Sequence, residues 1–279
     1  MRNSERKEQK PRMGSSLKAP NKCIFCNETS DFSSVEHIIP HSLGNDIFVL
    51  SKGWVCGNCN NIFSKFENRV LFKSIFGIER TRMGILTKKN RPSRADIGGI
   101  SWFAEPFENP NILSAEADWS KIPIFWDSQQ KTGKIPIIMH DDSCYDIARM
   151  LLKIGIEIAE VYNHADHKIN WNLEEAKNHI LGLDTKSWPY FALLTEISKT
   201  KFVSIFQNTP ESHSYLLSLG IDVFMHLVDD EIISVLKYGN LLVAICLTTR
   251  ETTWRKILVE WKISHVGCPV EYADISFKA

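Results

Sequence analysis

Apolar residues recur at helical spacing in two segments of the chain. The first segment begins near Cys56 and predicts a helix with a buried face formed by Ile62, Phe66 and Val70. The second begins after Asp142 and predicts a longer helix with one apolar face, made of Ile147, Met150, Leu151, Ile154, Ile158 and Val161. Asn172 stands three residues before Glu175, a capping-box pattern that predicts the start of a third helix.

Shorter apolar runs predict strands elsewhere. Residues 122–125 and 135–139 flank the polar segment 129–133, which predicts a hairpin. Near the C-terminus, five apolar runs predict an antiparallel meander, with Gly239 in one of its turns. The runs are 202–206, 223–227, 232–236, 241–247 and 257–261.

These patterns predict an α+β protein with a C-terminal antiparallel sheet. A polar basic stretch at 88–94 precedes Gly98 and Gly99, and we expect a domain boundary there. The chain is thereby divided into a flexible basic arm, a first module and a larger α+β domain, spanning residues 1–20, 21–95 and 96–279.

Composition narrows the class of protein. The chain has 279 residues and is 43% apolar, which is enough for a packed core and excludes a disordered or collagen-like protein. Its longest apolar run, 241–247, is far shorter than the ~18 residues of a membrane-spanning helix. The first 16 residues lack the apolar region of a secretory signal, so we expect a soluble cytoplasmic protein without membrane contact.

Charge is unevenly distributed along the chain. Residues 1–95 contain 17 basic and 8 acidic side chains, whereas the remaining 184 residues contain 16 basic and 25 acidic ones. A basic first part is typical of a protein that contacts a phosphate backbone, although charge scattered over two solvated surfaces gives the same count.

Four of the seven cysteines form two pairs of identical spacing, Cys23 with Cys26 and Cys56 with Cys59. In a reducing compartment, two such pairs predict thiolate ligands for one structural zinc ion rather than disulfides.

The segment between the pairs, residues 35–45, reads VEHIIPHSLGN, and Asn60 directly follows Cys59. With the flanking cysteines, this order resembles the zinc-stabilised HNH endonucleases over roughly residues 23–70. In that family an acidic residue and a histidine lie between two C-x2-C pairs, and the second pair is followed by Asn or His.

The resemblance implies a ββα-metal module, similar to a treble clef, with a catalytic metal. By position, Glu36 and Asn60 would be the metal ligands and His37 the general base. Oxygen ligands favour magnesium or manganese, and an imidazole with a pKa of about 6.5 suits the deprotonation of water. Neighbouring strand residues point to opposite faces, so a strand end or a bulge must bring Glu36 and His37 to one site.

Several assignments have competitors. Asn61 competes with Asn60 as ligand, and either residue could simply form local hydrogen bonds at a helix start. His41 could contact a phosphate or cap its loop. Where the family often has an asparagine that orients the base, this chain has Ser-Lys-Gly-Trp at 51–54. The orientation of His37 must come from another group, and a backbone carbonyl, Asn45 and Asp46 are the candidates.

A basic series extends along the predicted helix and beyond it. We expect this series and His41 to bind nucleic-acid phosphates. The series consists of Lys65, Arg69, Lys73, Arg80, Arg82, Lys88 and Lys89. A solvated helix face followed by a basic linker is the alternative.

These features predict a metal-dependent endonuclease that hydrolyses DNA, with duplex DNA as the expected partner. The acidic C-terminal part would repel a polyanion, so we expect it to bind a protein partner, form a homodimer or regulate cleavage. Effectors of phage defence and mobile-element nucleases are two settings that the resemblance implies. The alternative is a noncatalytic zinc module that binds nucleic acid or protein.

Overall fold

The computed structural model describes residues 18–45, 47–104, 113–129, 132–137, 141–164, 171–194, 221–228, 230–252, 254 and 271–275. Most of the basic arm expected at 1–20, and the strands expected at 202–206 and 257–261, lie outside these residues.

The first module has the expected ββα order. Strand β1 (Glu36–His37) pairs antiparallel with β2 (Val49–Leu50), and helix α1 (Gly57–Lys73) follows. Phe66 and Val70 are fully buried on α1, as predicted, while Ile62 is only partly buried. Helix α2 (Ile75–Arg82) continues after a break at Ser74, whose side chain accepts a hydrogen bond from the Phe76 N–H.

Two small sheets follow in the chain. The first is antiparallel, in the order β3-β4-β5, with strands Arg94–Ile97, Ile100–Ala104 and Leu113–Ala117. The second contains the predicted hairpin, shifted by a few residues, and has the order β12-β7-β6, with strands Glu271–Ile275, Thr132–Ile137 and Phe125–Asp127.

The C-terminal antiparallel sheet is confirmed. Its order is β8-β11-β10-β9, with strands Tyr190–Leu194, Leu241–Cys246, Glu231–Tyr238 and Ile221–Val228. The hairpin between β10 and β11 turns at Gly239, as predicted, because Tyr238 pairs with Leu241. Strand β8 was not predicted.

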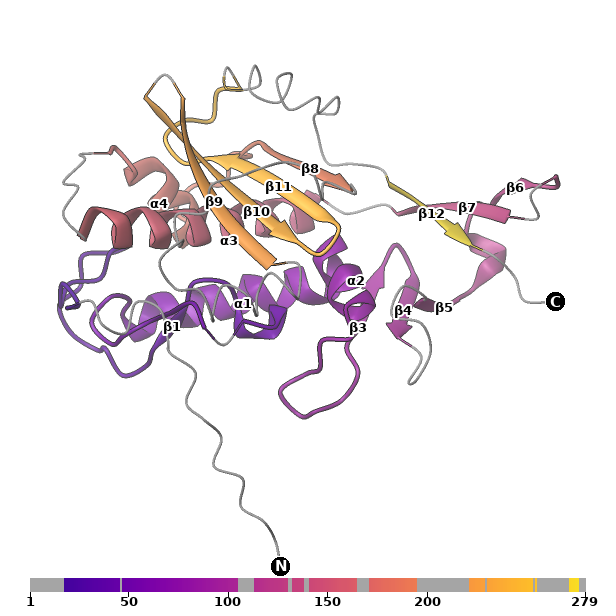
Figure 1. Ribbon diagram of the computed structural model, residues 1–279, viewed down its shortest axis with the longest axis horizontal. Coiled ribbons are helices and arrows are strands. Elements are labelled where there is room, and N and C mark those ends of the chain that lie inside the picture. The colour runs from indigo at the N-terminus through magenta and orange to yellow at the C-terminus, as the bar shows by residue number, and fades with distance from the viewer. Residues whose placement is uncertain are drawn as a thin grey trace, which may run out of the picture.

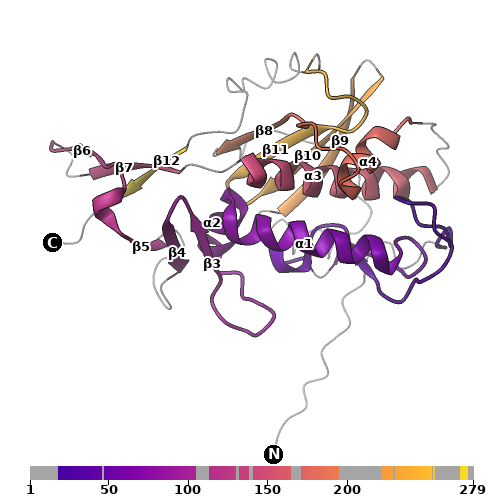
Figure 2. The same ribbon diagram turned by 180° about the vertical axis from the view of Figure 1, so that it is seen from behind.

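Helix α3 (Asp141–Tyr162) lies between α1 and this sheet, and α4 (Glu174–Leu181) packs beside it (Figures 1 and 2). The predicted apolar face of α3 is buried from Ile147 to Ile158. The predicted start of α4 was wrong by one residue, because its N-cap is Leu173 rather than Asn172, and the cap makes no side-chain hydrogen bond. None of the described helices is long and apolar enough to cross a membrane.

One hydrophobic core joins the first module to the C-terminal sheet. Buried side chains of α1, such as Phe63 and Phe66, form one continuous cluster with those of α3, α4 and the sheet. The domain boundary expected near residue 95 therefore lies between segments that share a core.

Candidate active site

The four cysteines of the two pairs come together at one end of the module. Their sulfur atoms all lie within 4.8 Å of one another, with Cys23 Sγ 3.7 Å from Cys59 Sγ and Cys26 Sγ 3.6 Å from Cys56 Sγ. Tetrahedral zinc with Zn–S bonds of about 2.3 Å requires sulfur separations of about 3.8 Å. The donor set and its spacing therefore fit a zinc ion.

The electrostatics of the thiols agree with this fit. The contact with Cys59 lowers the pKa of Cys23 to about 4, whereas burial raises the pKa of Cys26 to about 11. The same crowding beside Cys23 raises the pKa of Cys59. Four thiolates this close repel one another, and a bound dication removes that repulsion.

A cavity of about 280 Å³ opens between β1, the turn that follows it and α1. It is lined by Val35, Glu36, His37, Pro40, His41, Ser42, Asn60, Ser64, Glu67, Asn68, Leu71 and Lys88. The structure therefore brings Glu36, His37 and Asn60, which are 24 positions apart at the extremes, to a single concave site.

Strand β1 places both members of the Glu36–His37 dipeptide at this cavity. It has only two residues, in regular register with Leu50 and Val49, so the strand ends at His37. Glu36 is 5% exposed and points into the protein, whereas His37 is partly exposed. A short strand, rather than a bulge, lets both residues line the cavity.

The carboxylate of Glu36 meets a buried lysine from α3. Lys153 Nζ lies 2.5 Å from Glu36 Oε1, 3.1 Å from Glu67 Oε1 and 3.5 Å from Glu157 Oε2. Burial lowers the pKa of Lys153, but the carboxylates of Glu157, Glu36 and Glu67 outweigh burial and hold this pKa above its usual value. Lys153 is therefore a cation in the folded protein.

The pKa values of two of these glutamates are also raised, but here burial is the main cause. Burial raises the pKa of Glu36, although Lys153 acts against it, and burial raises the pKa of Glu157 further. Both Glu157 and Lys153 are completely buried, so the ammonium and this group of carboxylates form an ionic cluster screened from water.

Asn60 lies in the first turn of α1 with its amide held in one orientation. Its Nδ2 donates to Ser34 Oγ at 2.8 Å and to the Val35 carbonyl at 3.5 Å. The amide oxygen, the atom that a cation requires, is the other end of the same group. Asn61 is exposed and does not line the cavity, so its position favours Asn60 as the ligand.

The turn after β1 is built by Asn45 rather than by His41. Asn45 is fully buried, donates from Nδ2 to the carbonyls of Ile39 and Phe48, and accepts from the N–H groups of Ile47 and Phe48.

With its two donors and its acceptor oxygen used in this way, the Asn45 amide holds the loop and has no group left for His37. Asp46, the other candidate, lies outside the described residues. His41 is exposed, and its ring centroid lies 5.3 Å from that of His37, edge to face.

The basic series divides into exposed lysines and engaged arginines. Lys65, Lys73, Lys88 and Lys89 are exposed, and Lys88 reaches the cavity. The three arginines Arg69, Arg80 and Arg82 instead contact protein groups.

Arg69 pairs with Asp146, and Arg82 pairs with Glu79 at 2.5 Å. Arg80 is 3% exposed, and its Nη2 donates to the Leu86 carbonyl. In this conformation Arg80 is not part of the surface that a nucleic acid would meet.

Two charged residues at the site, Glu67 and Lys153, have no counterpart in the sequence-based expectations. The signal for Lys153 was a polar series at helical spacing, which continues on α3 through Asp146, Arg149 and Glu157. Such a series ordinarily indicates a solvated face, and here it is buried against α1.

Comparison with known proteins gives one match. Residues 23–74 match the family model described as HNH endonuclease, about a fifth of the chain, and confirm the resemblance for this segment. The match is to an endonuclease domain and extends over residues 23–74. No curated protein and no solved structure matches the chain.

Proposed function

We propose that the protein is a metal-dependent HNH endonuclease that cuts duplex DNA. The observation that supports this most directly is the single cavity lined by Glu36, His37 and Asn60 inside the segment that matches the nuclease family. Reducing conditions preserve thiolate zinc sites, so we place the reaction in the cytoplasm.

The donor set of the cavity fits a hard divalent cation. Glu36 offers a carboxylate oxygen and Asn60 an amide oxygen, which suit magnesium or manganese and not the thiophilic zinc of the cysteine cluster. When bound, such a cation supplies the charge that neutralises the scissile phosphate and the leaving 3′ oxygen.

The remaining side chains divide the other tasks. His37 accepts a proton from the water that attacks phosphorus, which leaves 5′-phosphate and 3′-hydroxyl ends. Lys88 and His41 line the same cavity and bind the phosphates on either side of the cut. The exposed Lys65, Lys73 and Lys89 extend this contact along the backbone without reading bases.

The C-terminal part carries the acidic excess of the chain and is a poor surface for DNA. We propose that it controls when cleavage occurs, through a protein partner or a second copy of the chain. In phage defence this control predicts cutting triggered by infection, whereas a mobile-element nuclease would cut a specific sequence without a trigger.

The test is cleavage of supercoiled plasmid, linear duplex, single-stranded DNA and RNA with magnesium or manganese varied. We expect the wild type to nick or linearise duplex DNA and His37→Ala to lose at least about 100-fold in rate, since general-base catalysis contributes 10²–10⁴-fold. His226→Ala, an exposed histidine on β9, is the matched control and should retain full activity.

The noncatalytic zinc module remains the competing function. In that case the wild type and His37→Ala would bind nucleic acid with equal affinity, and neither protein would cut any substrate with any divalent metal. Cleavage of RNA alone would move the substrate class from DNA to RNA.

A further inference from the structure

Helix α3 presents a row of charged side chains to the nuclease module. Asp146, Arg149, Lys153 and Glu157 follow one another at helical spacing, and each is at most 8% exposed. Asp146 pairs with Arg69 of α1, and the Arg149 guanidinium lies 4.5 Å from the centre of the Phe66 ring of α1. The row therefore faces α1 and the strand beside it.

Lys153 is the member of this row that reaches the catalytic dipeptide. Its Nζ donates to Glu36 Oε1 at 2.5 Å and to the His37 carbonyl oxygen at 2.6 Å, and lies 3.1 Å from Glu67 Oε1. Nζ also donates to the Ile38 carbonyl oxygen at 3.3 Å, so the three N–H donors of the ammonium are used by Glu36, His37 and Ile38, and Glu67 contributes an ion pair. One side chain thus contacts the carboxylate of Glu36 and the peptide that carries the imidazole of His37.

The position of the ammonium separates two roles. A lysine that takes the place of the divalent cation would have to sit in the cavity. Lys153 is fully buried and is not among the cavity-lining residues, although Glu36 and Glu67 are. It approaches Glu36 from the protein interior and leaves the cavity side of the site to the cation.

Stability alone is a weak reason for such an arrangement. Burying an ammonium with carboxylates gains little over apolar packing, because desolvation offsets the attraction of the charges. Groups that hydrogen-bond to a metal-binding carboxylate, in contrast, fix its orientation, and their loss commonly weakens metal binding 10–100-fold.

We infer that Lys153 is a positioning residue of the nuclease site, holding the Glu36 carboxylate and the His37 peptide in place from α3. This inference rests on the proposed function. It adds that residues 23–74 do not form a complete active site, because a side chain 79 positions beyond that segment fixes its ligand and its base.

The test compares the full-length wild type with Lys153→Met and Lys153→Gln. Manganese binding is measured by titration calorimetry and by the electron paramagnetic resonance signal of the ion, with Glu36→Gln defining binding outside the site. We expect both lysine variants to bind manganese 10–100-fold more weakly and to lose a similar factor in kcat. Zinc content and DNA affinity should stay unchanged.

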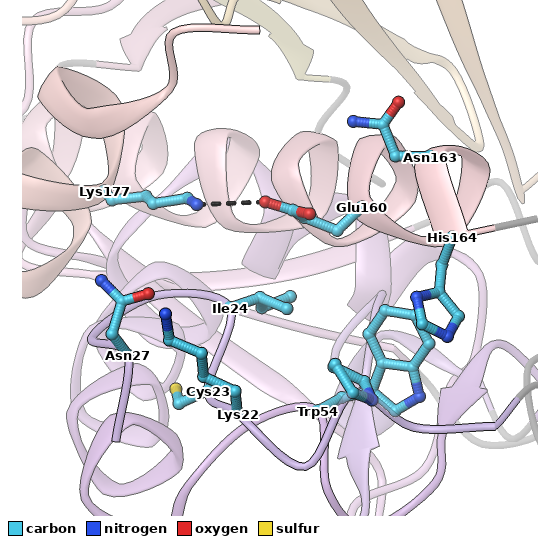
Figure 3. Close-up of a pocket in the computed structure, with 10 residues that line it drawn as sticks. Lys22, Cys23, Ile24, Asn27, Trp54, Glu160, Asn163, His164 and Lys177 are labelled. Carbon is cyan, nitrogen blue, oxygen red and sulfur yellow. Dashed lines mark hydrogen bonds and ion pairs between the residues drawn. The ribbon is translucent and has the colours of Figure 1, made fainter. Parts of the chain in front are cut away.

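The matched control is Lys177→Met. Lys177 of α4 lies 3.0 Å from Glu160 of α3, so it forms a partly exposed lysine–glutamate pair beside a different cavity (Figure 3). This variant should bind manganese and cut DNA as the wild type does.

The contrary outcomes are distinct. Unchanged manganese affinity and kcat in the Lys153 variants overturn the inference, and tighter manganese binding shows that Lys153 competes with the cation. Loss of zinc or of the folded state in both variants would show that Lys153 serves only stability, and this result also overturns the inference. If the wild type itself shows no Glu36-dependent manganese binding and no cleavage, the proposed function fails and takes the inference with it.

Discussion

Arg69 of α1 donates two hydrogen bonds to the carboxylate of Asp146 in α3, from Nε at 2.5 Å and from Nη2 at 2.7 Å. The residues are 77 positions apart, so the pair joins the segment that matches the HNH family to helix α3. The acceptor oxygens raise the pKa of Arg69 and keep its guanidinium charged. A side chain expected to bind DNA is therefore engaged in helix packing.

This pairing predicts that the basic series contributes unequally to DNA binding. Lys65→Gln, Lys73→Gln and Lys89→Gln should each weaken binding and reduce the dependence of log K on log salt by about 0.9 for each phosphate that the variant no longer neutralises. Arg69→Gln should leave that slope unchanged. Fluorescence anisotropy with a catalytically inactive background, at four or more salt concentrations, measures the slopes.

The same substitution should lower stability instead. The Arg69 side chain is 49% exposed, so solvent screens the pair and Arg69→Gln should cost about 1 kcal/mol. Urea unfolding measures this free energy. A reduced salt slope for Arg69→Gln without loss of stability would contradict the assignment of Arg69 to helix packing.

Removing zinc should destabilise more than the cysteine cluster. Cys56→Ser should lose zinc, and its free energy of unfolding should fall by several kcal/mol. Because the first module and the C-terminal sheet share one core, hydrogen exchange should rise in α3 as well as in α1. Cys246→Ala, at a buried cysteine on β11, should keep the zinc. Exchange confined to residues near the cysteines would show that the core does not transmit the loss.

Gly239 tests the contact between α2 and the sheet. Its φ of +57° favours glycine, and a Cβ at this position would collide with Glu79, whose Oε1 accepts the Asn240 N–H at 2.5 Å. Gly239→Ala should lower the free energy of unfolding by about 2–4 kcal/mol, since overpacking adds to the backbone strain.

Gly99 is the matched control, with a φ of +80° and nothing within 4 Å of an added Cβ. Gly99→Ala should cost only the backbone term of about 1 kcal/mol. Equal melting temperatures for the two variants would show that Glu79 can move aside.

His179 should make stability depend on pH. Burial, with the charges of Arg250 and Arg149, lowers its pKa to about 4, against about 6.5 in an unfolded chain. Between these values the unfolded state binds a proton that the folded state does not, so stability falls as pH falls from about 6.5 towards 4.

We expect the wild type to lose about 2 kcal/mol more than His179→Leu between pH 7 and pH 5. Urea midpoints at the two pH values measure the difference. Equal losses for both proteins would mean that His179 accepts a proton in the folded state.

The parts of the structure that the sequence predicts well are those specified locally. The two cysteine pairs and the apolar face of α3 follow from short spacings, the order of two strands and a helix follows from the resemblance to the HNH family, and the structure contains all of them. Strand β8 escaped notice because it is defined by its pairing with β11, some 50 residues later.

The polar face of α3 shows why the burial of Lys153 could not be predicted from the sequence. Charges at helical spacing have the same pattern whether they meet water or a second helix, so Lys153 gave no local sign of burial. Its role depends on Glu36 and Glu67, which lie 117 and 86 positions earlier. The same reasoning applies to Arg80, which belongs to a basic series by sequence and to the interior by structure.

The shared core also matters for any attempt to transfer the segment that matches the HNH family to another protein. A chimera that grafted only the segment from Cys23 to Ser74 onto a foreign scaffold would carry the cysteine cluster and the Glu36–His37 pair, yet it would lose the α3 side chains that pack on Phe66, such as Arg149. A functional chimera would also need a second helix, equivalent to α3, that packs on α1 and places a lysine ammonium beside β1.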